Sequence, residues 1–593
     1  MPGVTCSWQA TQSSWAAAGA ARRRRERGRA SVDRVMLSMP NPARPPDKTT
    51  AGGWGPSPVP SRMPGWKPPP RPRGGRKRIR RAPRIASLPS LARNTAWLTV
   101  AKSFSVAIYA LFGLVLPRLV PAPVNGVYTL MSTLLFFGGM AASFGIPVIL
   151  IRTIARDRSR TARIHADARR ALLAGAALSS CLVLGWLLAE MAGQGEFDPV
   201  RLVLGGLVCA LLFADALGSL GEALFQAHER MAFPARVEVA TGLVRAGGAL
   251  LALSLLPAAG LFGVFGCFLL GSAVRAWVLG RAARREFLAG PPVAGGGWAG
   301  ALALVRESLG VALFRVLRMV RNRVDTLLLG VLVAPVAGLG AMATADAARG
   351  LYGQAMRVVF VFHTLTLALN TAVFPRLARL GKDAAARAEG RRQFGRVVRY
   401  QAWWASLLAA LVFVYADELA GWFGPAYRQG IAGLQGTTGQ ALRILVAAVL
   451  LDSIGGPVGM LMVGRPEMDR KLPAFGAALA SVSLVLNLIL IPRWGLIGAA
   501  WSSLGAAAVE LLIKAAVLRR LLGSARALVG SLPYLGLAAA VAVILAAGPL
   551  AASPILGGLA GGLVYLAVCA AAGLLDPAVA RRLGLGRRRE PAP

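Results

Sequence analysis

The sequence contains few of the side chains on which most enzymes and metalloproteins depend. Its 593 residues include only 26 acidic residues, three histidines and five cysteines. The cysteines form no CxxC pair, so they indicate neither a zinc site nor a disulfide framework. The sequence also lacks GxxxxGK[ST], HExxH and GxSxG motifs. Hydrolysis of nucleotide, zinc-dependent proteolysis and serine-hydrolase chemistry are therefore not expected of this chain.

Long uncharged stretches dominate the sequence instead. Hydrophobic residues make up 55% of the chain, charged residues only 16%, and the mean hydropathy is +0.56. Residues 119–151 and 527–575 contain no Asp, Glu, Lys or Arg, and a helix crosses a bilayer with about 20 apolar residues. We therefore expect an all-α integral membrane protein of about fourteen transmembrane helices, near residues 96–117, 127–150, 171–191, 202–222, 236–257, 260–280, 304–331, 350–375, 399–419, 440–463, 471–492, 496–518, 527–548 and 553–574.

The charges of the expected loops indicate how the chain is oriented. Clusters of Arg and Lys follow the second, sixth, eighth, tenth and twelfth helices. The odd-numbered loops are sparse in basic residues, with Arg118, Arg349, Arg428 and Arg493. Because an excess of Lys and Arg marks the cytoplasmic side, we expect both termini inside, in a bacterial cytoplasmic membrane. No outside loop is long enough for a catalytic domain.

The N-terminal segment is strongly basic. Residues 1–94 hold 20 Lys and Arg against three acids and are rich in Pro and Gly, a composition typical of disorder. No apolar segment follows the basic run as in a signal peptide. Because the segment shows no sign of a folded surface that could recognise nucleic acid, we expect it to lie near anionic lipid rather than to bind nucleic acid. Met36, Met39 and Met63 are alternative start sites, so residues 1–62 need not be translated.

Two pairs of similar segments indicate an internal repeat. Pro257-x-x-Gly260-Leu-x-Gly resembles Pro492-x-x-Gly495-Leu-x-Gly, and Gly126-Val-Tyr resembles Gly350-Leu-Tyr. Their places in the helix order predict two six-helix lobes related by a parallel pseudo-twofold axis, an arrangement common in secondary transporters. Chance similarity in a Gly- and Ala-rich chain is the alternative. The expected division is residues 1–94 (tail), 95–300 (N-lobe), 301–520 (C-lobe), 521–575 (two further helices) and 576–593 (cytoplasmic tail).

The seventh expected helix carries an unusual number of charges. Arg315, Arg318, Asn322 and Asp325 are spaced to share one face, and Arg321 lies beside them. A charge at the bilayer centre costs at least about 2.5–3.5 kcal/mol, so this face must line a cavity or meet partners. Guanidinium groups match phosphate oxygens, which favours a phosphate or pyrophosphate ligand. Lys102 and Arg245 are weaker candidates for the same site. A surface-lying amphipathic helix, with the span starting near Val324, is the alternative.

Further acids fall inside the expected helices. Asp215, Asp452 and Glu510 are candidates either for binding a coupling H⁺ or Na⁺ or for structural ion pairs with nearby arginines, and Asp325 joins them. Gly455-Gly456-Pro457 would permit a kink in the tenth helix. We expect no metal site and no cofactor beyond a coupling ion.

A set of short motifs resembles a known family. The chain resembles the Wzx-type polysaccharide exporters, or oligosaccharide flippases, whose superfamily also holds multidrug and toxin extrusion transporters and lipid II flippases. A long basic tail and an Ala- and Gly-rich insertion near 334–349 depart from the family pattern. The motifs that carry the resemblance, over about residues 90–575, are Arg118-(x7)-Gly126-Val-Tyr128, Asp325-Thr-Leu-Leu-Leu-Gly330, Gly350-Leu-Tyr352, Phe374-Pro-Arg-Leu377, Gly424-Pro-Ala-Tyr427 and Asn487-(x4)-Pro492-(x2)-Gly495-Leu-Ile-Gly498-Ala-Ala.

The resemblance implies a function without enzymatic chemistry. Such proteins move undecaprenyl-pyrophosphate-linked oligosaccharides to the outer leaflet for O-antigen, capsule or exopolysaccharide assembly, beside glycosyltransferases and a polysaccharide polymerase. Arg315 and Arg318 would then hold the pyrophosphate, and Asp325 would balance the arginines or take part in coupling. A lipid II flippase, a cation-coupled drug or metabolite antiporter and a membrane-embedded glycosyltransferase or polymerase are the alternatives.

Overall fold

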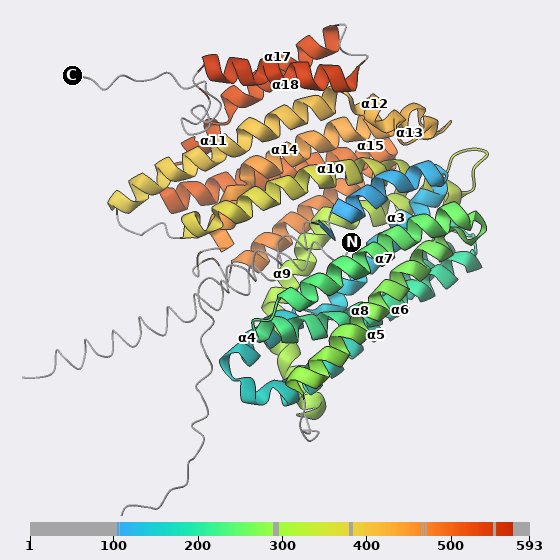
Figure 1. Ribbon diagram of the computed structural model, residues 1–593. Coiled ribbons are helices and arrows are strands. Elements are labelled where there is room, and N and C mark those ends of the chain that lie inside the picture. The colour runs from blue at the N-terminus through green and yellow to red at the C-terminus, as the bar shows by residue number, and fades with distance from the viewer. Residues whose placement is uncertain are drawn as a thin grey trace, which may run out of the picture. The chain divides into compact units, whose positions relative to one another are not determined.

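The computed structural model describes residues 104–288, 296–378, 384–463, 471–548 and 553–574, apart from positions 106 and 573, together with Arg465 and Met468. Within these residues every regular element is a helix (Figure 1). The tail at residues 1–94 and the candidate Lys102 lie outside the described residues. The helices are Ala107–Leu119, α3 (Ala122–Ser143), α4 (Ile146–Arg156), η1 (Arg158–Arg160), α5 (Thr161–Gln194), α6 (Pro199–Ala227), α7 (Ala232–Leu255), η2 (Pro257–Ala259), α8 (Gly260–Phe287), α9 (Gly297–Leu332), α10 (Ala341–Ala378), α11 (Ala384–Val414), α12 (Ala416–Gly421), α13 (Pro425–Gln429), α14 (Thr438–Val463), α15 (Leu472–Leu522), α16 (Arg526–Val529), α17 (Leu532–Ala547) and α18 (Pro554–Ala571).

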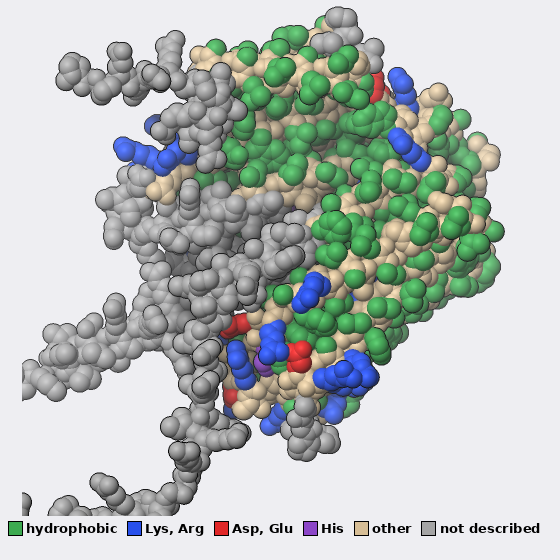
Figure 2. Space-filling view, in the orientation of Figure 1, with side chains coloured by type: hydrophobic (Ala, Val, Ile, Leu, Met, Phe, Trp, Pro, Cys, Tyr) green, Lys and Arg blue, Asp and Glu red, His purple; other side chains and the backbone are tan. Residues whose placement is uncertain are grey.

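Most of these helices have the composition of membrane spans. In the described part of the chain, ten stretches are long and apolar enough to cross a bilayer. Hydrophobic side chains accordingly cover most of the face seen in Figure 2, with Lys and Arg toward its edges. The charged helices α9 and α10 are not among the ten, although they pack inside the protein. The chain is thus a multi-pass membrane protein.

Glycines at positive φ break the helices where the sequence predicts turns. Gly260 has φ 47° and ψ −132°, and Gly495 has φ 52° and ψ −128°. This backbone region is open almost only to glycine. The glycines of the two Pro-x-x-Gly-Leu-x-Gly segments therefore share one backbone conformation, and α15 is in effect two helices joined at Gly495. An unexpected break separates α3 from α4, where Phe144 and Gly145 both have positive φ.

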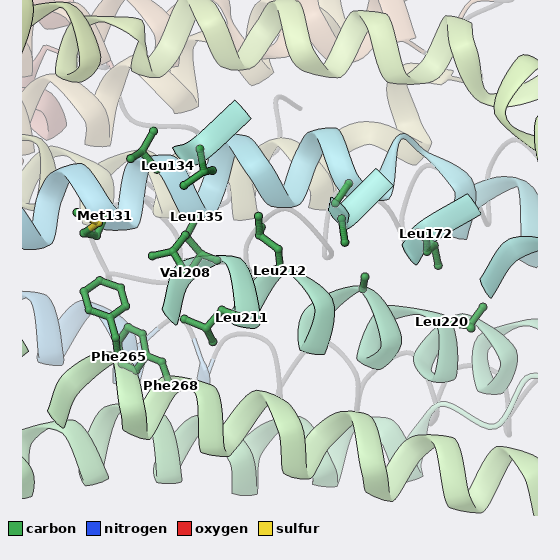
Figure 3. Close-up of a cluster of buried hydrophobic side chains, with 14 of the residues drawn as sticks. Met131, Leu134, Leu135, Leu172, Val208, Leu211, Leu212, Leu220, Phe265 and Phe268 are labelled. Carbon is green, nitrogen blue, oxygen red and sulfur yellow. The ribbon is translucent and has the colours of Figure 1, made fainter. Parts of the chain in front are cut away.

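The buried apolar side chains form three main clusters. The first is built mainly from α3 to α8, and Figure 3 shows side chains of α3, α5, α6 and α8 meeting within it. The second joins α10, α11, α14 and α15, and the third places α17 and α18 against α11.

Helix α9 connects the first two clusters. Its residues Ala301 and Leu304 belong to the first cluster, whereas Leu329 belongs to the second. At its start, Gly296 N–H donates to Asp167 Oδ2 of α5 at 3.2 Å, which satisfies one of the donors that a helix N-terminus leaves unpaired. Helix α9 also packs against α5 and α15, so it is part of the helix bundle.

Helix α10 is longer than the sequence indicated. It begins at Ala341 rather than near residue 350, so most of the apparent insertion at 334–349 forms its first turns. Arg349 consequently lies inside a helix and not in an outside loop. The ninth expected helix is likewise shifted: α11 ends at Val414, and the short α12 follows it.

The two Gly-x-Tyr motifs of the repeat pack directly against each other. A Cβ atom at Gly126 would overlap the backbone of Asp346, and one at Gly350 would overlap the backbone of Ala122. Each glycine thus meets the residue four positions before the other, so the contact is reciprocal. This close approach joins α3 to α10.

The glycine contact can be tested by adding one methyl group. We expect Gly126→Ala to lower the unfolding temperature in detergent by several degrees, because overpacking at a close contact costs about 1–3 kcal/mol. Gly139→Ala on the same helix is the matched control, since open space surrounds Gly139 and alanine is the better helix former. Equal unfolding temperatures for the two variants would contradict the close packing of α3 and α10.

Candidate functional site

A polar cavity lies among helices α9, α10, α14 and α15. Its walls include the last turns of α14 and the first turns of α15, next to the basic loop around residues 464–471. Phenylalanine, methionine and leucine form its apolar part. The polar and charged lining residues are Arg318, Arg321, Asn322, His363, Thr366, Asn370, Asp452, Glu510 and Lys514.

Arg321 is the centre of an ionic cluster in this cavity. It donates to both carboxylate oxygens of Asp452, at 2.8 and 3.1 Å, and lies 2.8 Å from Glu510 Oε2. Lys514 contacts the other oxygen of Glu510 at 2.7 Å. Asp452 and Glu510 are therefore partners in ion pairs, one of the two roles predicted for them. The four side chains together carry no net formal charge.

Only some of the other residues predicted to bind phosphate line the cavity. Arg318 is exposed and lines the cavity, and Asn322 also lines it and accepts a hydrogen bond from Arg321 at 2.8 Å. Arg315 is half-buried on α9 and is not part of the lining. With Arg318 included, the lining carries three cationic and two anionic side chains, so its net formal charge is positive.

Asp325 lies apart from these arginines. It is buried and accepts hydrogen bonds from Thr326 N–H at 2.7 Å, from Ser503 Oγ at 3.2 Å and from the Tyr352 hydroxyl. Among the described residues no basic side chain reaches ion-pair distance of its carboxylate. Asp325 thus forms no ion pair with the described arginines of α9, and the ion-pair partners of Arg321 are Asp452 and Glu510 on other helices.

Arg245 and Asp215 belong to a second ionic cluster, among the N-terminal helices. Arg245 donates to Asp215 at 3.3 Å and to the Tyr109 hydroxyl at 3.3 Å. Arg275 contacts Glu222, and its Nε lies 2.9 Å from Glu238. Asp215 is thus an ion-pair partner too. The structure separates Arg245 from the cavity that Arg318 lines.

A third ionic cluster, which sequence reasoning missed, joins α5 and α6 to α10. Arg349 of α10 donates to Glu190 of α5 at 2.6 Å, and Arg201 of α6 pairs with Asp346 of α10. Arg349 Nε also donates to the Thr326 carbonyl of α9 at 3.1 Å, and the Arg349 side chain is fully buried. No signal in the sequence singled out this cluster, because its members lie at helix ends and resembled loop charges. We call it the junction cluster.

Beside the junction cluster, α10 also contacts α3 through an arginine that bonds to neutral side chains. Arg357 of α10 donates to Asn125 Oδ1 at 2.7 Å and to Thr129 Oγ at 2.9 Å, both on α3. Asn125 in turn donates a hydrogen bond to the Tyr427 hydroxyl at 3.0 Å. Burial raises the pKa of Tyr427 to about 12. The phenol therefore stays neutral. Arg323 of α9 lies over the ring of Phe136 on α3, a cation–π contact.

No group of three or more His, Cys, Asp or Glu side chains in the described residues is arranged to hold a metal ion. The cavity offers charge and hydrogen bonds to a bound anion or polar solute.

Comparison with known proteins relates part of the chain to a family. Residues 91–381 match the family of polysaccharide biosynthesis proteins. No curated protein matches the sequence.

Solved structures of two membrane transporters share the fold of this chain. The lipid II flippase MurJ, in an inward closed conformation, superposes with a TM-score of 0.62 at 11% identity, over 81% of this chain and 99% of that one. A multidrug resistance transporter of the MATE family, of the MOP superfamily and in an inward-facing conformation, gives a TM-score of 0.50 at 13% identity, over 70% of this chain and 95% of that one. The expected resemblance is confirmed for the fold, which this chain shares with both transporters.

We expect the loss of one charge from the junction cluster to lower the stability of the protein strongly. Replacing Arg349 with Met leaves Arg201 as the cation between two buried carboxylates, Glu190 and Asp346. We expect the uncompensated buried charge to cost about 3–5 kcal/mol of stability. Arg443→Met is the control, because Arg443 and Asp417 form a partly exposed ion pair worth about 0–1 kcal/mol. Thermal unfolding of the purified full chain in detergent compares the two. Equal losses would show that the junction cluster contributes no more than an exposed pair.

Proposed function

We propose that this protein is a flippase that carries undecaprenyl-pyrophosphate-linked oligosaccharides across the bacterial cytoplasmic membrane for cell-surface polysaccharide assembly. The observation that carries the proposal is the lining of the cavity, where Arg318 is the third cationic side chain beside two anionic ones and makes the net formal charge positive. Guanidinium groups hold phosphate oxygens through paired, charge-assisted hydrogen bonds. The family and the superfamily fold support this choice of substrate.

The residues would divide the work within the cavity. Arg318 contacts the pyrophosphate, with Asn322 as a neutral donor beside it. Arg321 is held by Asp452 and Glu510 and so contributes a fixed positive charge close by. Arg315, on the same helix, would assist when the head group enters or leaves. Lys102 and Arg245 are retained only as remote contributors to the electrostatic potential, because Arg245 is paired in the N-terminal cluster.

Movement between two access states would follow the predicted architecture of fourteen spans in two six-helix lobes plus two helices. The matching backbone at Gly260 and Gly495 and the reciprocal contact of Gly126 and Gly350 support the repeat. The junction cluster joins the lobes near helix ends expected outside. The cavity lies beside a loop expected inside, which suits loading from the inner leaflet. Asp325, buried without an ion-pair partner among the described residues, is the first candidate for binding a coupling H⁺ or Na⁺.

The substrate is tested by flipping in proteoliposomes. The assay follows a fluorescent undecaprenyl-pyrophosphate glycan and compares the unaltered protein with Arg318→Gln and with Arg315→Ala/Arg318→Ala. We expect Arg318→Gln to slow flipping by about 10-fold or more, because a hydrogen bond to a charged group contributes about 1.5–3 kcal/mol. Arg443→Gln, remote from the cavity, should match the unaltered protein.

The outcomes separate the alternatives. An active protein with an unimpaired Arg318→Gln variant would keep the flippase and remove the site. Flipping of lipid II but of no other glycan would favour a lipid II flippase. Failure with every lipid by correctly folded protein, with export of cationic drugs, would favour the antiporter.

The orientation is tested by labelling single cysteines in a cysteine-free background. Phe197, in the loop between α5 and α6, is 72% exposed and is expected outside. Ser159, between α4 and α5, is exposed and is expected inside. A membrane-impermeant maleimide should label Phe197→Cys in intact cells and Ser159→Cys only after permeabilisation. The reverse pattern would overturn the proposed orientation.

A further inference from the structure

The part of the cavity around Arg321 carries both acidic and basic side chains and so differs from the part that Arg318 lines. Arg321, Lys514, Asp452 and Glu510 form a polar cluster without net charge. Such a cluster offers carboxylate acceptors beside cationic donors. A site that bound only phosphate would gain nothing from two carboxylates close to the anion, because like charges repel.

Asn370 adds a polar group without a partner. Its side chain is only 7% exposed and lines the cavity, yet its Oδ1 makes no hydrogen bond to any described residue. A buried carbonyl oxygen without a donor costs about 1–3 kcal/mol. A buried polar group that is retained despite this cost indicates a ligand that donates the missing hydrogen bond to it.

Glycines of α14 make room for this polar group. A Cβ atom at Gly456 would collide with the Asn370 amide, and one at Gly455 would lie 3.1 Å from Lys514 Cδ. The Gly455-Gly456-Pro457 segment therefore lets Asn370 and Lys514 reach the cavity from the opposite helices. Its glycines act as space for polar side chains, a role separate from the predicted kink.

We propose that this part of the cavity binds the hydroxyl groups of a neutral sugar ring of the transported glycan, an inference that rests on the proposed flippase function. A hydroxyl group both donates and accepts hydrogen bonds. It can therefore donate to Asn370 Oδ1 or to a carboxylate and accept from Arg321 or Lys514. Phe314 and Phe475 in the same lining offer apolar faces to the C–H side of a ring. The pyrophosphate then lies toward Arg318 and the sugar toward Asn370.

Other ligand classes fit the lining less well. A metal ion would need a set of acids or histidines, which the described residues do not assemble. An apolar drug would leave the four charged side chains and Asn370 without new partners. Asn370 is thus assigned as a residue that determines specificity for the glycan.

The test replaces Asn370 with Leu, which is similar in size and cannot accept a hydrogen bond. Thr364→Val is the matched control on α10, because the Thr364 hydroxyl bonds only to the helix backbone and does not line the cavity. Proteoliposomes are loaded with undecaprenyl pyrophosphate bearing no sugar or one of a panel of neutral mono- and disaccharides. The readout is the ratio of the flipping rate of each sugar-bearing lipid to that of the bare lipid.

We expect Asn370→Leu to lower this ratio roughly tenfold for at least one sugar, with the unfolding temperature not reduced. Arg318→Gln should lower both rates in parallel, and Thr364→Val should change neither. An unchanged ratio in Asn370→Leu, or an equal fall for bare and sugar-bearing lipids, would overturn the sugar assignment and leave the flippase standing. Flipping of neither lipid by the unaltered protein would overturn the flippase and the sugar site together.

Discussion

Compensation of buried charge is the constraint on which the rest of this structure depends. An isolated charge in an apolar interior is so unfavourable that charged groups there must be paired or solvated. Helices α9 and α10 carry too many charges to face lipid, and they are accommodated because other helices supply the partners. Asp452 and Glu510 hold Arg321, while Glu190 and Arg201 meet Arg349 and Asp346. The packing of these two helices is therefore set by ion pairing as much as by apolar contact.

Close helix packing and ion pairing support each other at the junction between α3, α5, α6 and α10. The reciprocal glycine contact at Gly126 and Gly350 brings α3 against α10, and Arg349 can then reach Glu190 and the Thr326 carbonyl. If the helices separated, these charges would need water or new partners.

The sequence predicted the parts of the fold that depend on local composition. Apolar length located the helices, and the Pro-x-x-Gly-Leu-x-Gly repeat predicted turns whose glycines share one backbone conformation. Spacing along α9 predicted that Arg318 and Asn322 share a cavity, yet it misplaced Asp325, whose partners are Tyr352 and Ser503. Which acid meets which arginine depends on helices more than 100 residues apart. Arg349 was mistaken for a loop residue because the first turns of α10 lack a continuous apolar pattern, and Asn370 carries no sequence signal at all.

The mixed charge of the cavity also bears on how a carrier can release what it binds. A transport site must bind strongly enough to be filled and weakly enough to empty on the other side. Arg318, Arg321 and Lys514 without acids nearby would bind a pyrophosphate too tightly to release it easily. Asp452 and Glu510 reduce the net formal charge of the lining to that of one cation. Under the proposed function, the affinity then comes from many moderate contacts shared between phosphate and sugar. These contacts are lost together when the helices around the cavity move apart.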